Sequence, residues 1–209
     1  MYNISHFKEP ERSRILNLMA DNPFAFLTGS FKNGRQVATQ IPLLIEQRED
    51  ELILLGHIMR NTDHHRAFID NPIALAVFTG PHTYVSAKWY SSPNVGSTWN
   101  YMSVHASGEV VFMDDEELIN FMKKLTLHFE GGDAHSPTFY DNLSQDYVDK
   151  MMGAIVGFEI EVKNLNHVFK LSQNKDKQTY QNIIKHLEFQ EGDGAKIAAE
   201  MKKRENELF

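Results

Sequence analysis

Runs of alternating apolar and polar side chains recur along the chain, and this period of two is typical of β-strands with one covered face. In the run at 101–112, for example, Val104 and Ala106 flank His105. The pattern predicts strands at 24–30, 36–45, 52–56, 73–79, 84–89, 101–112, 155–162 and 167–171. The stretch at 73–79 is almost entirely apolar, which predicts a strand buried on both faces.

Apolar residues at spacings of three and four predict helices between these strands. Asp114 and Glu117 form a capping-box pattern at the start of a helix that ends at Gly131-Gly132. Asn61-Thr62-Asp63 leads into a shorter helix that stops before Pro72. The expected helices cover 10–20, 64–69, 114–130 and 144–152, and two more follow residue 176, separated at Gly192-Asp193-Gly194.

The connection between the first two strands has the strongest turn signal. Lys32-Asn33-Gly34-Arg35 joins them, and Asn-Gly is the preferred centre of a type I′ hairpin turn. Most strands follow one another through short turns, without the helical crossover that parallel pairing needs. The order therefore predicts a mainly β protein, an antiparallel barrel of seven or eight strands with helical decoration.

Size and composition fit one large domain, or one domain with an appendage. The 209 residues are 42% hydrophobic, which is enough for a substantial core. Cysteine is absent, so disulfides and thiol chemistry are excluded. No apolar run reaches the roughly 18 residues of a membrane span, and the N-terminus lacks the order of a signal peptide. A cytoplasmic location without membrane contact is expected.

The charge balance is acidic, with 28 acidic and 21 basic residues and a net charge of −7. A broad surface for nucleic acid normally appears as a basic face, so the composition argues against direct DNA binding. The basic triplet Lys202-Lys203-Arg204 has acidic neighbours and is interpreted as a solvated helix end.

Two strand ends carry short polar clusters suited to a small ligand. One is Lys170-Leu171-Ser172-Gln173-Asn174, and the other runs from Gly80-Pro81-His82 to Trp99-Asn100-Tyr101. Lysine can neutralise a phosphate, and the amide and hydroxyl groups can bond a heterocycle. The alternatives are a solvent-facing strand end for the first cluster and aromatic packing between subunits for the second.

A third candidate lies at the predicted strand-to-helix junction after residue 56. Arg60 and the free amides of the helix start could hold a phosphate, with His57 beside them. Arg60 and Arg66 as plain surface charges are the alternative reading. His64 and His65 are adjacent, so they point in different directions on a helix, and no metal site is predicted. Thr39 and Gln40 form either an outward polar face or a set of partners for a ring.

Five stretches in this order resemble one known family, the PaiB-type FMN-binding negative transcriptional regulators of the FMN-binding split-barrel superfamily. The resemblance runs from Met1-Tyr2 to Met201. It is carried by Ala38-Thr39-Gln40-Ile41-Pro42-Leu43-Leu44, Gly56-His57-Ile58-Met59-Arg60-Asn61, Gly80-Pro81-His82-Thr83-Tyr84-Val85-Ser86, Thr98-Trp99-Asn100-Tyr101 with Val104-His105, and Lys170-Leu171-Ser172-Gln173-Asn174.

The resemblance implies a Greek-key split barrel over 1–175, with a helical extension at 176–209 that packs on the barrel or on a partner. It also implies a homodimer with FMN at the subunit interface. The cofactor contacts expected on this basis are Thr39, Gln40, His57, Arg60, Asn61, Trp99, Asn100, Tyr101, Lys170, Ser172 and Gln173. No catalytic residue is predicted.

Three functions are compatible with this fold. The first is a flavin-binding regulator that acts through a protein partner or DNA, although no helix-turn-helix pattern is present. The second is an FMN-dependent oxidoreductase, similar to flavin reductases or pyridoxamine-phosphate oxidases. The third is a haem-binding protein, for which His82, His105 and His167 are the candidate axial ligands.

Overall fold

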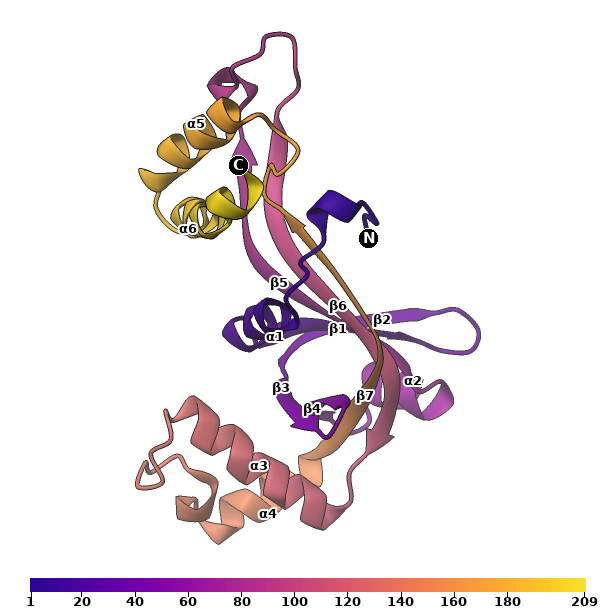
Figure 1. The fold of residues 1–209 in the computed structure, drawn as a ribbon. Coiled ribbons are helices and arrows are strands. Elements are labelled where there is room, and N and C mark those ends of the chain that lie inside the picture. The colour runs from indigo at the N-terminus through magenta and orange to yellow at the C-terminus, as the bar shows by residue number, and fades with distance from the viewer. The chain divides into compact units, whose positions relative to one another are not determined.

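The computed structural model describes all residues from 1 to 209, and Figure 1 shows its elements. The strands are β1 (Phe24–Ser30), β2 (Gln36–Pro42), β3 (Leu44–Arg48), β4 (Glu51–Met59), β5 (Ile73–Val85), β6 (Thr98–Phe112) and β7 (Ile155–Lys170). The helices are α1 (Arg12–Asp21), α2 (Asp63–Asp70), α3 (Asp115–Phe129), α4 (Gln145–Ala154), α5 (Lys177–Glu188) and α6 (Asp193–Leu208). Three short 3-10 turns lie at Ser5–Phe7, Ala87–Trp89 and Tyr140–Asn142.

The strands form one sheet in the order β2-β1-β5-β6-β7-β4-β3. The pairs β1–β2, β1–β5, β3–β4 and β4–β7 are antiparallel. The chain divides into two compact units. Unit 1 comprises residues 1–22, 78–104 and 166–209, and unit 2 comprises residues 23–77 and 105–165. No helix is long and apolar enough to cross a membrane.

Unit 2 has its core where α3 packs on β4. Ile53 and Leu55 of β4 meet Leu118, Phe121 and other buried residues of α3. The capping box at the start of α3 is confirmed, because the Glu117 amide donates to Asp114 at 2.8 Å and the Asp114 amide donates to Glu117 at 2.9 Å. The burial of one α3 face explains its apolar spacing.

Unit 1 is built around two C-terminal helices that lie side by side, α5 and α6 (Figure 1). The hydroxyl of buried Tyr180 donates to the Met201 carbonyl at 2.9 Å and joins the two helices. The N-terminal segment is tied to α6 by Arg204, whose Nη2 lies 2.6 Å from Glu9 Oε2. Arg204 is therefore buried, and the interpretation of its triplet as a solvated helix end is wrong at this residue.

Two strand predictions are wrong because pairing changes along the chain. The expected strand at 36–45 is divided at Leu43, where the amide donates to the Pro23 carbonyl and the side chain is buried. Residues before the break pair with β1, and residues after it pair with β4. Conversely, the expected strands 155–162 and 167–171 belong to one continuous strand, β7, which ends at Lys170, because residues 163–166 keep extended backbone.

Three local predictions also need correction. In the β1–β2 hairpin only Gly34 has a positive φ, of 85°, so the turn is not type I′, which requires a second left-handed residue. The predicted strand at 84–89 is wrong after Val85, where β5 ends and Ser86 accepts a hydrogen bond from the Lys88 amide to start a short turn. The 73–79 stretch is buried on only one face, and Ile73 is 51% exposed.

Candidate functional site

A cavity of about 460 Å³ lies in unit 2 between β2, the end of β4 and the start of α2. Ligand pockets commonly have volumes of this size. Its lining residues are Ala38, Thr39, Ile41, His57, Ile58, Met59, Thr62, Asp63 and His64. Two of the predicted contact residues, Thr39 and His57, are among them.

The turn between β4 and α2 is fixed by its own hydrogen bonds. Asn61 has a left-handed backbone, with φ of 61°, and its amide donates to His65 Nδ1 at 3.1 Å. The Thr62 hydroxyl donates to the Met59 carbonyl at 2.9 Å and accepts from the His65 amide. Arg66 Nη2 donates to the Asn61 carbonyl at 2.7 Å. The helix therefore begins at the cavity wall in a defined orientation.

Arg60 stands immediately before this turn. Its amide donates to the Ala154 carbonyl at 2.8 Å, which fixes the backbone. Its side chain is exposed and makes no hydrogen bond or ion pair within the chain. An unengaged guanidinium beside a helix start is a suitable partner for a phosphate group.

Two histidines present unpartnered ring nitrogens in the cavity wall. His57 Nδ1 and His64 Nε2 are buried and have no hydrogen-bond partner. The other ring nitrogen of His64 lies 3.2 Å from Asp63 Oδ1. Burial lowers the pKa of His57, so its ring is neutral at neutral pH. A buried polar atom without a partner is costly, and both of these residues line the cavity.

Thr39 and Gln40 are adjacent on β2 and differ in position. Thr39 is half-buried and lines the cavity. Gln40 is exposed, does not line the cavity and pairs across the strands with Phe26. The structure thus brings Thr39 and His57 to one cavity, with Arg60 and Asn61 at the adjoining turn, and leaves Gln40 outside it.

The remaining predicted residues lie in unit 1, at the ends of β6 and β7. Lys170 Nζ donates to the Thr98 hydroxyl and to the Trp99 carbonyl, the latter at 3.0 Å. Burial, followed by the nearby charge of Lys175, lowers the pKa of Lys170. Its ammonium group therefore fixes the end of β6.

The amide and hydroxyl groups of this cluster are also engaged within unit 1. The Ser172 hydroxyl donates to Asn100 Oδ1 at 2.9 Å, and both side chains are buried. Gln173 accepts from the Leu171 amide at 2.7 Å and donates to the Phe169 carbonyl at 2.5 Å. These three side chains hold the strand ends together, and a direct contact with a ligand would require their bonds to open.

Trp99 and Tyr101 lie on the exposed side of β6. Trp99 is 53% exposed, and its ring centroid lies 6.0 Å from that of Tyr84 and 6.4 Å from that of His82. Tyr101 is half-buried. The rings of Trp99, Tyr84 and His82 form an aromatic surface in unit 1. Tyr84 and His82 were not among the expected cofactor contacts. The alternation of side chains along β5 puts His82 and Tyr84 on the same face of the strand, and this pattern is visible in the sequence.

The candidate haem ligands have different surroundings. His167 Nε2 accepts from the Glu9 amide at 3.0 Å, so that nitrogen is engaged. His82 Nδ1 lies 3.3 Å from the Gly80 carbonyl. His105 is half-buried, and burial lowers its pKa. None of the three lines the cavity of unit 2.

Sequence reasoning did not include Thr62, Asp63 and His64 among the contact residues, although all three line the cavity. The sequence did mark Thr62 as the start of the helix, because it occupies the N-cap position before an apolar helix face. His64 was considered only as a metal ligand, and its unpartnered nitrogen depends on packing that the sequence does not reveal.

The seven-stranded sheet with its helices defines the class of split-barrel proteins. The fold is similar to that of an FAD and heme binding protein from Mycobacterium smegmatis, with 20% identity, coverage of 78% of this chain and 72% of that one, and a TM-score of 0.55. It is also similar to a flavocytochrome from Azotobacter vinelandii, with 15% identity, coverage of 81% and 72%, and a TM-score of 0.58.

The chain belongs to the family described as "Putative FMN-binding domain", whose model matches residues 1–164. It is 33% identical over 203 residues to the "Protease synthase and sporulation protein PAI 2" of Bacillus subtilis, and the match covers 96% of each chain. The family assignment made from the five sequence stretches is therefore confirmed, and FMN is the cofactor that defines the family.

Proposed function

We propose that this chain is a PaiB-type FMN-binding regulator, and that it holds the cofactor phosphate at the β4–α2 turn. One observation carries the proposal: the unengaged Arg60 stands at the turn that adjoins the unit 2 cavity, whose lining includes two histidines with buried, unpartnered nitrogens. The positive end of the α2 dipole favours an anion at this place. Asp63, in the first turn, opposes it in part, and its carboxylate is occupied by His64.

The residues at the cavity fit a phosphate ester attached to a polar heterocycle. Arg60 supplies a charged donor, and the Asn61 turn sets the direction of the backbone. The Thr39 and His57 side chains add polar character to the wall. Bound FMN supplies the redox chemistry, while the chain positions it and limits its access to solvent.

A homodimer completes this proposal. The outer face of β1 exposes Phe24 and Phe26, and Phe26 pairs with Val77 of β5 in the same sheet. Exposed aromatic residues at alternate positions of one strand share a face, and such a face is typically covered by a partner. We propose that a second copy covers it, and that Trp99, Tyr101 and Lys170 contribute to the flavin environment of the dimer.

A regulatory role follows from the similarity to the Bacillus subtilis protein, whose name refers to protease synthesis and sporulation. The net charge of −7 favours action through a protein partner over direct contact with DNA. In this proposal, the occupancy or redox state of the flavin is the signal that the partner reads.

The test compares FMN with riboflavin, which has the same ring and lacks the phosphate. Flavin fluorescence or absorption would be titrated with wild-type protein, the Arg60→Ala variant and the Arg12→Ala variant. Arg12 is the matched control, because it is exposed and makes no hydrogen bond or ion pair.

Arg60→Ala is expected to weaken FMN binding by about tenfold or more, because a charge-assisted hydrogen bond contributes roughly 1.5–3 kcal/mol. Riboflavin binding should be unchanged in this variant, and Arg12→Ala should change neither. Equal weakening of both flavins would move the phosphate away from Arg60. A protein that takes up no FMN at all would overturn the proposed function.

A further inference from the structure

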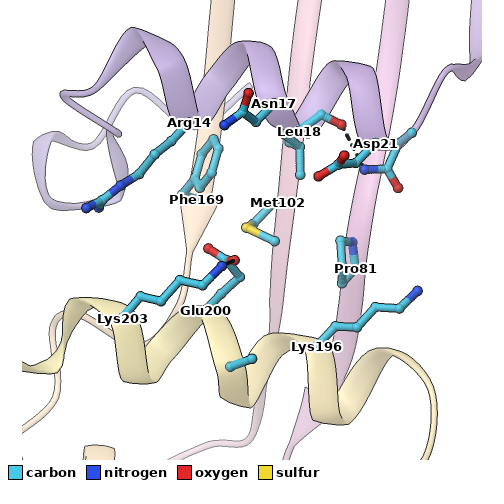
Figure 2. Close-up of a pocket in the computed structure, with 12 residues that line it drawn as sticks. Arg14, Asn17, Leu18, Asp21, Pro81, Met102, Phe169, Lys196, Glu200 and Lys203 are labelled. Carbon is cyan, nitrogen blue, oxygen red and sulfur yellow. Dashed lines mark hydrogen bonds and ion pairs between the residues drawn. The ribbon is translucent and has the colours of Figure 1, made fainter.

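A second cavity, of about 510 Å³, lies entirely within unit 1 (Figure 2). Helices α1 and α6 form its two sides. Its floor consists of apolar side chains from β5, β6 and β7 and from α1, namely Pro81, Met102, Phe169 and Leu18. No residue of this cavity belongs to the proposed FMN site.

The charged groups at one end of the cavity neutralise each other. Arg14 Nη2 lies 2.8 Å from Glu207 Oε1, and Arg14 Nε lies 3.0 Å from Glu11. Glu200 lies 2.6 Å from Lys203 and 2.6 Å from Arg204, and these cations keep its pKa low against the opposing effect of burial. This end therefore offers little unbalanced charge to a ligand.

The other end, next to Pro81, carries one unpaired carboxylate and one ammonium group in a longer ion pair. Asp21 at the end of α1 makes no hydrogen bond or ion pair. Lys196 of α6 forms an ion pair with Asp193 at 3.6 Å, which is longer than the pairs at the first end. Figure 2 shows Asp21 and Lys196 on opposite helices, with Pro81 between them. A carboxylate and an ammonium group thus flank one end of an apolar floor.

We propose that this cavity binds an α-amino acid with a large apolar side chain. The ligand ammonium would pair with Asp21, and its carboxylate would pair with Lys196. Its side chain would lie on Met102 and Phe169. An α-amino acid carries both charges at one end and an apolar group at the other, which matches the distribution of charge along the cavity. The volume accommodates an aromatic side chain.

The test is isothermal titration calorimetry with L-phenylalanine, N-acetyl-L-phenylalanine and L-phenylalaninamide on the FMN-saturated full chain. The acetyl group removes the ligand's positive charge, and the amide removes its negative charge. Each derivative should bind wild-type protein about fivefold more weakly than L-phenylalanine, the effect of losing one partly exposed charge pair. The penalty for acetylation should disappear in Asp21→Asn, and the penalty for amidation should disappear in Lys196→Gln.

Two further variants locate the ligand. Ala199 is exposed and lines the cavity, so Ala199→Trp should fill it and weaken binding more than tenfold without disturbing the core. Ala20 is exposed on α1 and does not line the cavity, so Ala20→Trp is the matched control and should bind normally.

Some outcomes would overturn the proposal: no binding up to about 10 mM, normal binding by Ala199→Trp, or derivative penalties that persist in the charge variants. The same titrations on FMN-free protein and on Arg60→Ala separate the two proposals. Amino-acid binding should stay intact in both samples, even where FMN binding is lost.

Discussion

The buried ion pair between Arg204 and Glu9 gives the sharpest stability prediction. Arg204→Met removes the guanidinium and keeps most of the side-chain volume. Both side chains are almost inaccessible, at 6% and 2%, and the pair distance is 2.6 Å. The Glu9 carboxylate would then retain the Glu11 amide at 3.1 Å and Arg14 at 3.7 Å. It would therefore lose its close charged partner and keep only the more distant Arg14 in the core of unit 1.

Breaking one side of a buried ion pair costs about 3–5 kcal/mol, because the remaining charge has lost both water and its partner. Loss of the cation–π contact between Arg204 and Phe169, at 5.5 Å, adds up to about 1 kcal/mol. We expect Arg204→Met to lower the free energy of unfolding by about 4 kcal/mol. Glu9→Gln should cost about half as much, since Arg204 keeps Glu200.

The measurement is urea unfolding at neutral pH and fixed protein concentration. The two tryptophans, Trp89 and Trp99, both belong to unit 1, so intrinsic fluorescence reports on the unit that contains the pair. The double variant Glu9→Gln/Arg204→Met should lose less than the sum of the single losses, by about 2 kcal/mol. Lys203→Met is the exposed control and should cost below about 1 kcal/mol.

Two results would refute this reasoning. A loss below about 1 kcal/mol for Arg204→Met would mean that solvent reaches the pair. Strictly additive single losses would mean that Glu9 and Arg204 do not depend on each other. If Arg204→Met does not fold, Arg204→Lys keeps the charge and should recover part of the stability, which a packing defect alone would not do.

Three other predictions concern a close contact, a buried bond and a titration. Gly108→Ala would place a Cβ atom 1.9 Å from a carbonyl oxygen of β7, so we expect the free energy of unfolding to fall by more than about 3 kcal/mol in thermal or urea unfolding. Gly153→Ala meets open space and should be neutral or stabilising. Ser172→Ala should cost about 1–2 kcal/mol in urea unfolding, because it leaves the buried Asn100 carbonyl oxygen without its donor, and an unchanged midpoint would exclude a structural role for this bond. Burial lowers the pKa of His57 below its ordinary value of 6.5. Its contribution to stability is therefore complete above pH 6.5 and is lost as pH falls through the folded pKa. In urea unfolding over this pH range, His57→Asn should lose less stability in acid than wild-type protein, and an equal pH dependence would contradict the role of His57.

Features set by neighbouring residues could be predicted from the sequence. The capping box at Asp114 and Glu117 and the helix start at Thr62 follow from contacts within a few positions. The break at Leu43 could not be predicted, because it arises where the chain changes partners from β1 to β4. The exposure of Ile73 could not be predicted without the arrangement of the sheet, since an apolar strand pattern does not show which of its faces is exposed.

The candidate site also has one part that the sequence predicts and another that depends on packing. The approximate place of a phosphate group follows from Arg60 at a predicted strand-to-helix turn. The bond between Ser172 and Asn100, 72 positions apart, has no sequence signal, so the side chains were expected to be available for a ligand when they are engaged with each other. The unpartnered nitrogen of His64 likewise results from packing between elements.

The segmentation of unit 1 has a consequence for the synthesis of the protein. Its three segments end at residues 22, 104 and 209, so α1 is made long before the helix that holds it. At about 5–20 residues per second, the ribosome needs roughly ten seconds or more to go from Glu9 to Arg204. During that time Glu9 and Arg14 lack the partners that α6 supplies, Arg204 and Glu207, so the N-terminal segment is not yet held. A chaperone that binds nascent chains would therefore find its target at the N-terminus, and a chain released a few residues before Arg204 would keep that target exposed to proteases.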